Sequence, residues 1–212
     1  MKSDIDFYFD FISPYGYLAA MKIESIGLQH RRRINWQPFL LGITVLKTMG
    51  LKPLMETPLK GDYCRYDIPR LAKILNVPIN LNTNMNPNPL PAIRSAYWVK
   101  QHAPQLISTF CREVMMAQWQ QGQDISHVEV IEKILKSLNI NTDSYLADIQ
   151  SDTLKQNVVK EVENTMEVGV FGSPTFVVDG EMIWGVDRLW MLEHWLRHES
   201  WHHDDSKLMP VD

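Results

Sequence analysis

The sequence predicts an α/β protein whose single sheet is built by a β-α-β unit near the N-terminus and a β-hairpin near the C-terminus. Three observations support this fold class. Residues 5–28 change from a strand pattern to a helix pattern, residues 42–164 carry helical patterns without a convincing strand, and residues 169–185 return to strand patterns. With 212 residues, of which 45% are hydrophobic, the chain can bury its own core.

The first element is a strand over residues 5–11. Apolar and polar side chains alternate along it, as expected for a pleated ribbon with one buried face. The aromatic set is Phe7, Phe9 and Phe11, and the set between them is Asp6, Tyr8 and Asp10. We therefore expect the first set in the core and the second set on the open face.

A helix follows directly. Ser13 fits the N-cap, because its hydroxyl oxygen can accept an orphan amide, and Pro14 fits the first helical position, because it has no amide to leave unsatisfied. Gly27 is predicted to end the helix. A hydroxyl at the positive end of a helix, just beyond the carboxyl end of a strand, lies where anions and ligands bind in open α/β sheets. The alternative is that Ser13 only caps the helix and takes no part in binding or catalysis.

A second strand is predicted over residues 34–41, ending at Pro38 or shortly after, which closes the β-α-β unit. Ser126 is predicted to cap one of the helices that follow. The helical patterns cover residues 66–75, 90–102, 105–121, 126–138 and, with breaks, 142–168.

Strand patterns return from Gly169, and the pair Asp179-Gly180 between two apolar runs predicts a two-residue hairpin. Asp187 is expected to cap a closing helix over residues 188–197. This order of elements is the thioredoxin arrangement. We divide the chain accordingly into a thioredoxin-like domain of residues 1–41 and 165–200, an inserted helical domain of residues 42–164 and a polar tail of residues 201–212.

The net charge of −4 and the pI near 6.0 provide no basic surface for nucleic acid. No stretch approaches the length of a membrane span, and Lys2, Asp4 and Asp6 stand where a signal peptide needs an apolar run. We therefore expect a cytoplasmic protein without a nucleic-acid or membrane partner. The two cysteines, Cys64 and Cys111, are in no CxxC arrangement and are expected to be free thiols that fill the core.

Four segments carry a resemblance to a known family. They are FDFISPY at residues 9–15, PLKGDY at residues 58–63, GVFGSPT at residues 169–175 and WGVDRL at residues 184–189. Together, and in this order, they resemble the 2-hydroxychromene-2-carboxylate isomerase family, which is related to kappa-class glutathione transferases and to DsbA. The resemblance spans residues 5–198. It implies a DsbA-type thioredoxin-like fold, a glutathione cofactor and, commonly, a homodimer.

Ser13 is the catalytic residue that the resemblance implies. Thioredoxin-like oxidoreductases carry a CxxC pair at the start of the first helix, whereas this chain has Ser13, Pro14, Tyr15 and Gly16. The protein supplies no thiol there, and the family borrows the thiol of glutathione. A helix N-terminus and a hydrogen-bond donor favour the thiolate form of a group whose ordinary pKa is ~8.5. Ser13 would donate that bond, with Pro14 and Tyr15 beside it in the cofactor site.

Other predicted cofactor contacts come from the last two segments. Ser173-Pro174 resembles the family's cis-proline loop, whose unpaired backbone at Ser173 would pair with the main chain of glutathione. The alternative is an ordinary proline at the start of a strand. Val186-Asp187-Arg188 matches the family segment that holds the γ-glutamyl end, although Asp187 could be no more than an N-cap.

Lys60 matches a family lysine that could attract an anionic substrate or the glycyl carboxylate of glutathione, and otherwise it is a solvated lysine. Relatives often carry an asparagine that contacts glutathione where this chain has Leu51, which leaves the natural substrate open. Met, Trp and aromatic residues of the helical block, around Met55 and Trp98, would line an apolar substrate pocket.

The resemblance leads to one main function and three alternatives. The main function is glutathione-dependent cis-trans isomerisation of an aromatic, unsaturated 2-oxo acid, through thiolate addition, bond rotation and elimination. The alternatives are a kappa-like transferase that conjugates electrophiles, a DsbA-like disulfide oxidoreductase and a non-catalytic glutathione-binding domain. The missing CxxC pair disfavours the oxidoreductase.

Residues 198–202, HESWH, match the HExxH pattern in which two histidines one helical turn apart hold zinc. His194 and His203 lie nearby in the sequence. Only ten residues follow the motif, too few for a third ligand and a cleft. We therefore expect no catalytic metal and treat the pattern as a coincidence.

Overall fold

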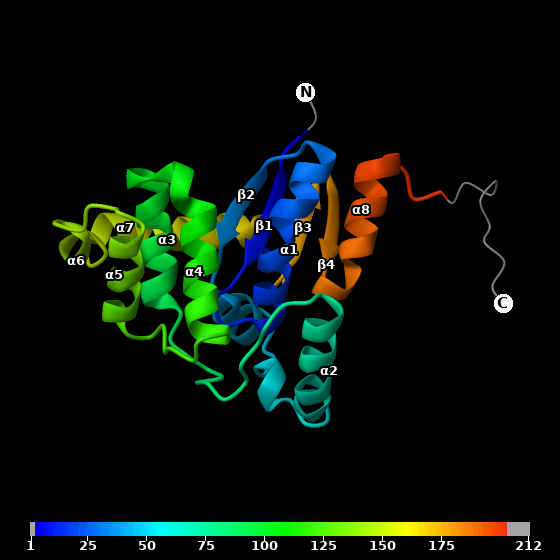
Figure 1. Ribbon diagram of the computed structural model, residues 1–212, viewed down its shortest axis with the longest axis horizontal. Coiled ribbons are helices and arrows are strands. Elements are labelled where there is room, and N and C mark those ends of the chain that lie inside the picture. Colours follow the sequence, from blue (N-terminus) through cyan, green and yellow to red (C-terminus); the bar gives the residue numbers. More distant parts are fainter. Residues whose placement is uncertain (1–2, 203–212) are drawn as a thin grey trace.

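The computed structural model describes residues 3–202 and contains a four-stranded sheet in the order β2-β1-β3-β4 (Figure 1). β1 and β2 are parallel, whereas β3 runs antiparallel to β1 and to β4. The sheet therefore joins a β-α-β unit to a C-terminal hairpin, and the predicted order of elements is confirmed. The strands are β1 (Ile5–Phe9), β2 (Ile34–Pro38), β3 (Thr175–Val178) and β4 (Glu181–Trp184).

Helix α1 (Pro14–His30) connects the two parallel strands. It begins as predicted, with Ser13 at the N-cap, but the prediction that Gly27 ends it is wrong. The helix continues to His30 and ends at Arg31, whose φ is 55°. Gly27 instead lies inside the helix where a Cβ would come within 2.7 Å of the Arg32 carbonyl oxygen. Glycine at this position allows the helix and the turn toward β2 to approach closely.

The prediction of one open face on the strand of residues 5–11 is wrong at two positions, and the strand itself ends at Phe9. Tyr8 is 8% exposed, and Asp10, directly after β1, is fully buried. The reason is that β1 is an interior strand of the sheet and is covered on both faces, as interior strands flanked by a parallel neighbour commonly are. A second, smaller core cluster of Tyr8, Phe39 and Val170 fills the face opposite Phe7 and Phe9.

The segment between β2 and β3 is helical and contains no strand, in agreement with the sequence patterns. Figure 1 shows α3 to α7 grouped on one side of the sheet and α2 apart from them, near the start of α1. The elements are η1 (Gly42–Thr48, a π-helix), η2 (Leu54–Glu56), α2 (Lys60–Ile74), α3 (Leu90–His102), η3 (Pro104–Leu106), α4 (Ile107–Trp119), α5 (Val128–Ser137), α6 (Tyr145–Asp148) and α7 (Asp152–Glu167).

Ser126 does not cap α5, contrary to the prediction. His127 occupies the N-cap position and makes no side-chain capping bond. The Ser126 hydroxyl oxygen accepts the Asn88 backbone N–H at 2.7 Å instead, and so joins α5 to the loop before α3. The Ser126 oxygen therefore bonds to a backbone amide of this loop and not to an amide of the first turn of α5.

One hydrophobic core extends from the sheet into the helical block. The Trp119 indole N–H donates to the Phe11 carbonyl at 2.8 Å, and the Tyr97 hydroxyl donates to the Pro38 carbonyl at 2.6 Å. The division at residues 41/42 and 164/165 stays a prediction, because the core is continuous across it. Cys64 and Cys111 are both buried and free, as predicted.

The C-terminal part follows the sequence pattern with one exception. Asp179 and Gly180 have φ values of 52° and 87°, which fit the two-residue turn of a hairpin. The expected capping role of Asp187 is wrong, because Arg188 holds the N-cap position of α8 (Leu189–His198), and no side-chain cap bond forms. Asp187 lies in the short 3-10 turn η4 (Val186–Arg188). Of the predicted polar tail, residues 203–212 lie outside the described residues.

Within residues 3–202, no helix combines the length and hydrophobicity needed to cross a bilayer.

Candidate functional site

The candidate site begins at the N-terminus of α1. The Ser13 side-chain oxygen accepts the Gly16 N–H at 3.0 Å, and the Ser13 carbonyl accepts the Tyr17 N–H at 2.9 Å. Pro14 occupies the first helical position, and the Tyr15 N–H has no acceptor within residues 3–202. Ser13 is 5% exposed. A capped helix start with a free amide therefore lies at the carboxyl end of β1, as predicted.

The loop before β3 lies against this helix start. The Ser173–Pro174 peptide bond is cis, as the resemblance implies. The Ser13 hydroxyl donates to the Ser173 carbonyl at 3.1 Å, across a separation of 160 residues. The Ser173 carbonyl is thus not unpaired, contrary to the prediction, whereas the Ser173 N–H has no acceptor among the described residues.

The turn η4 packs against α1 and brings a third segment to the same end of the sheet. The Arg188 guanidinium donates to the Trp184 carbonyl at 2.8 Å and lies 5.7 Å from the centre of the Trp184 ring. Asp187 and Arg188 form an ion pair at 3.6 Å that is partly open to solvent. Gly185, with φ of 106°, leaves room for both side chains to fold back over the turn.

Tyr15 links the helix start to α2. Its hydroxyl donates to one oxygen of Asp67 at 2.9 Å, while the Tyr63 hydroxyl donates to the other at 3.1 Å. Burial, together with Cys64 and Asp67 nearby, raises the pKa of Tyr15, so its hydroxyl keeps its proton at neutral pH. Lys60 is the exposed first residue of the same helix, and no contact joins it to Ser13 or Ser173 within the part of the chain described.

Sequence reasoning missed Asp10, which lies beneath the site. Its backbone N–H donates to the Ser173 hydroxyl oxygen at 3.1 Å, and its backbone carbonyl accepts the Ser13 N–H at 3.1 Å. Its carboxylate accepts the backbone N–H groups of Ile12 at 3.2 Å and Leu41 at 2.8 Å. Burial raises the pKa of Asp10 to about 7 against these hydrogen bonds. The available signal was a carboxylate directly after an interior strand, three residues before a helix N-cap.

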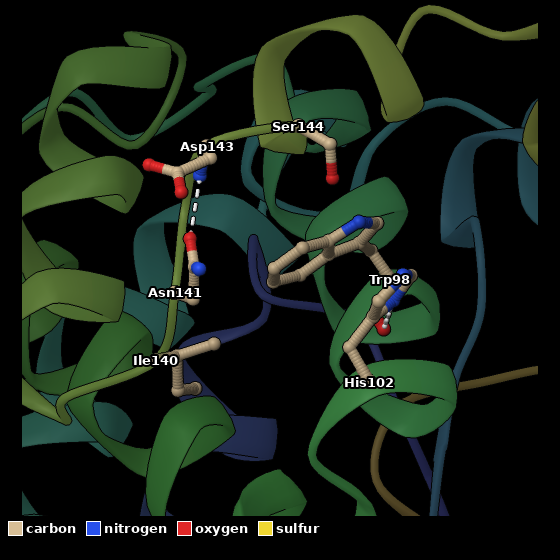
Figure 2. Close-up of a pocket in the computed structure, with 6 residues that line it drawn as sticks. All are labelled: Trp98, His102, Ile140, Asn141, Asp143 and Ser144. Carbon is tan, nitrogen blue, oxygen red and sulfur yellow. Dashed lines mark hydrogen bonds between the residues drawn. The ribbon is translucent and has the colours of Figure 1, made fainter.

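Trp98 does not face this site. It lines a separate cavity of about 300 Å³ in the helical block, shown in Figure 2, with walls from α3 and from the segment before α6. The Trp98 indole N–H donates to Asp148 at 2.9 Å, and the His102 ring stacks on Trp98 at 4.3 Å. The cavity is lined by Trp98, His102, Ile140, Asn141, Asp143 and Ser144. None of these residues lies on an element that carries Ser13 or Ser173.

A second cavity, of about 330 Å³, lies just beyond the carboxyl end of β2. Leu40 and Ile43 form one wall, and α3 and α7 supply mainly apolar side chains to the others. Arg94, Lys155 and Glu163 also line it. Leu40 is followed in the chain by Leu41, whose N–H is bonded to Asp10, so this cavity begins close to the candidate site. Met55 is half-buried in η2, and Leu51 is 52% exposed in the segment before it.

The HExxH residues do not form the pattern's zinc-binding geometry. Helix α8 ends at His198, and Glu199 takes a φ of 51°, so His198 and His202 are not one helical turn apart on the same face. Within residues 3–202, no cluster of three His, Cys, Asp or Glu side chains could hold a metal ion. His203 lies outside the described residues.

Comparisons with known proteins agree with the fold and with the resemblance drawn from four segments. A family model described as a DSBA-like thioredoxin domain matches residues 4–197. Human glutathione S-transferase kappa 1 is 27% identical, over 93% of this chain and 92% of that protein. The 2-hydroxychromene-2-carboxylate isomerase of Pseudomonas putida is 24% identical, over 89% of this chain and 92% of that protein. A solved structure of 2-hydroxychromene-2-carboxylate isomerase has a TM-score of 0.82 and 24% identity, over 92% of this chain and 95% of that chain.

Proposed function

The chain belongs to the DSBA-like thioredoxin domain family, and on that premise we propose that it is an enzyme that uses the thiol of glutathione. The reaction that we propose is cis-trans isomerisation of an aromatic, unsaturated 2-oxo acid. The support is kinship over nearly the whole chain with an isomerase and a kappa-class glutathione transferase.

One observation carries the proposal: a hydroxyl group, not a thiol, occupies the N-terminus of α1. Ser13 caps this helix beside the cis-proline loop, and both cysteines are buried in other helices. Reactive sulfur must therefore come from a bound molecule. The positive end of α1 and the free Tyr15 N–H would stabilise that sulfur as a thiolate and lower its pKa.

The other predicted residues supply groups that match the ends of glutathione. The free N–H of Ser173 can pair with the cysteinyl main chain. The backbone N–H groups of Val186 and Asp187, which have no acceptor within residues 3–202, suit the γ-glutamyl carboxylate, and the Asp187 carboxylate suits its ammonium group. Arg188 and the exposed Lys60 provide positive charge for the remaining carboxylate.

The isomerisation proceeds without net gain or loss of electrons or protons. Bound glutathione would supply a thiolate that adds to the β-carbon of the conjugated ketone and leaves again, so that the bond between addition and elimination is single and could rotate. Helix α1, through its positive N-terminus and the free Tyr15 N–H, would hold the sulfur as a thiolate before the addition and after the elimination.

The cavity beyond β2 has the chemistry that such a substrate needs. Its volume of about 330 Å³ is near the lower end of ligand-pocket sizes, which suits a single-ring acid. Its apolar walls suit the ring, and Arg94 and Lys155, which line the cavity together with Glu163, suit the carboxylate. We assign the substrate to this cavity and not to the vicinity of Trp98.

A second candidate reaction is conjugation of glutathione to an electrophile. The similarity to human glutathione S-transferase kappa 1 favours it as strongly as the other comparison favours isomerisation. The two reactions share the thiolate and differ in whether the C–S bond is broken again. Mass analysis of the product separates them, because an isomer keeps the substrate mass and a conjugate gains that of glutathione.

The experiment that tests the proposal is a thiolate titration. Glutathione mixed with the wild-type protein should give thiolate absorbance in the near ultraviolet below the ordinary thiol pKa of ~8.5. S-methylglutathione, which has no ionisable thiol, should bind without this signal. In Ser13→Ala the signal should fall several-fold, because the helix loses its cap and its bond to the Ser173 loop. A wild-type protein that binds glutathione only as the thiol would refute the proposal.

A further inference from the structure

The hydroxyl groups of the two serines at the candidate site differ in whether they donate a hydrogen bond within the protein. The Ser13 hydroxyl oxygen accepts the Gly16 N–H, and the Ser13 O–H donates to the Ser173 carbonyl. Ser13 is also 5% exposed. To donate to a bound sulfur, Ser13 would have to break the bond that holds the cis-proline loop.

The Ser173 hydroxyl, in contrast, accepts a hydrogen bond but donates none among the described residues. Its hydroxyl oxygen accepts the Asp10 N–H at 3.1 Å, but its own proton has no acceptor within residues 3–202. Ser173 as a residue is also more exposed than Ser13. A hydroxyl that accepts a hydrogen bond is a better donor through its own proton, because linked hydrogen bonds polarise one another.

The Ser173 hydroxyl lies against the first turn of α1. A Cβ built on Gly16 would come within 2.7 Å of the Ser173 Oγ and 3.2 Å of the Ser13 Cβ. The glycine at position 16 therefore leaves the space in which both serine side chains lie at the helix N-terminus. The Ser173 hydroxyl, whose proton has no acceptor in the described part of the chain, therefore lies at the same helix N-terminus as the Ser13 side chain.

We propose that Ser173 is a second catalytic residue, whose hydroxyl donates a hydrogen bond to the glutathione sulfur. The inference rests on the proposed function and names the donor that it needs. In this arrangement Ser13 holds the loop and caps the helix, and Ser173 stabilises the charged sulfur. The two serines then have separate tasks, which separate substitutions can distinguish.

The test compares two variants of equal shape, Ser173→Thr and Ser173→Val, which differ by the hydroxyl group. Each is saturated with glutathione, and the pKa of the bound thiol is read from thiolate absorbance against pH. A hydrogen bond to the charged form lowers a pKa, so the bound thiol in Ser173→Val should titrate about one unit higher than in Ser173→Thr. At a pH below both pKa values, Ser173→Val should therefore hold about tenfold less thiolate than Ser173→Thr.

Ser126→Ala is the matched control, because Ser126 also accepts a backbone N–H but lies in the helical block. It should leave the thiol pKa unchanged. Circular dichroism checks folding, and Ser173→Ala replaces Ser173→Val if the latter does not fold. Equal thiol pKa values with and without the hydroxyl would overturn the assignment of Ser173 while leaving the proposed function intact. Absence of thiolate in the wild-type protein would instead remove the proposed function itself.

Discussion

Asp10 is a fully buried carboxylate directly beneath the two serines of the candidate site. Its side chain makes two hydrogen bonds to backbone N–H groups, which favour the charged form, but burial has the larger effect and raises its pKa to about 7. A group with such a pKa changes protonation within the physiological range. Its backbone N–H donates to the Ser173 hydroxyl oxygen, so Asp10 lies one hydrogen bond away from the candidate site.

We predict that Asp10 makes stability fall as pH rises. Its folded-state pKa is above the unfolded value of 3.8, so the protonated group contributes stability that is full below pH ~4 and is lost as pH rises through about 7. Asp10→Asn cannot titrate. The free energy of unfolding of the wild type minus that of Asp10→Asn, measured with urea at several pH values, should therefore decrease between pH ~4 and ~7. A constant difference across this range would show that folding does not raise the pKa of Asp10.

Residues whose role is local could be predicted, and residues whose role depends on a distant partner could not. Ser13 and Pro14 follow from helix-capping chemistry alone. Asp10 continues the alternating pattern of β1, and this pattern gives no sign that both faces of the strand are covered. Asp187 is of a residue type that is favoured at helix N-caps. The chain turns at Gly185, however, and the Asp187 carboxylate pairs with Arg188 instead.

The residue that caps the C-terminus of helix α1, Arg31, adopts a conformation that residues with a Cβ disfavour. Arg31 adopts the left-handed region with φ of 55°, and its backbone N–H donates to the Leu28 carbonyl at 3.3 Å. Residues with a Cβ pay a steric cost there that glycine does not.

We therefore predict that Arg31→Gly stabilises the protein, whereas Arg31→Ala does not. Both substitutions remove the same guanidinium, but only glycine removes the Cβ that crowds the left-handed conformation. The free energy of unfolding should be about 1 kcal/mol higher for Arg31→Gly than for Arg31→Ala. Urea denaturation followed by tryptophan fluorescence measures the difference, and equal midpoints for the two variants would contradict the prediction.

Helices and strands could be predicted where interactions between residues close in the sequence determine their ends. The pattern over residues 90–102 matches α3 at both ends, because apolar spacing and flanking prolines define it locally. The end of α1 and the cap of α5 were missed because tertiary contacts decide them. Gly27 packs against the turn to β2, and Ser126 accepts an amide from a loop 38 residues away.

At the scale of the whole molecule, the two ends of the chain share one sheet. β1 pairs with β3 across about 170 residues, and the turn between β3 and β4 is tied to the start of β2 by an ion pair. Arg32, whose side chain is 1% exposed, donates to both oxygens of Asp179 at 3.1 and 2.8 Å. The alternating pattern identifies the strands, and the order of the elements, which is the thioredoxin arrangement, indicated that they share one sheet, but neither predicted this ion pair.

We predict that Asp179→Asn destabilises the protein by about 3 kcal/mol, the lower end of the cost of breaking a buried ion pair. Asparagine accepts the left-handed φ of 52°, so the turn is kept while the charge that balances Arg32 is lost. The lower end applies because the Asp179 side chain is 27% exposed and Glu199 lies 3.8 Å from Arg32. Urea denaturation at neutral pH gives the free energy of unfolding.

Asp4→Asn is the matched control for this ion pair. Asp4 pairs with Arg33 at 3.2 Å, one residue along the chain from Arg32, but the Arg33 side chain is 88% exposed. Exposed pairs contribute little, so this variant should stay within about 1 kcal/mol of the wild type.

Burial raises the pKa of Asp179, but hydrogen bonds from Ser3 and Arg32 outweigh it and the net pKa is lowered. The cost of Asp179→Asn should therefore shrink as pH falls below the ordinary carboxyl pKa, because the protonated wild type loses the same charge. If the two variants cost the same at neutral pH, the junction between the chain ends depends on packing and not on this buried pair.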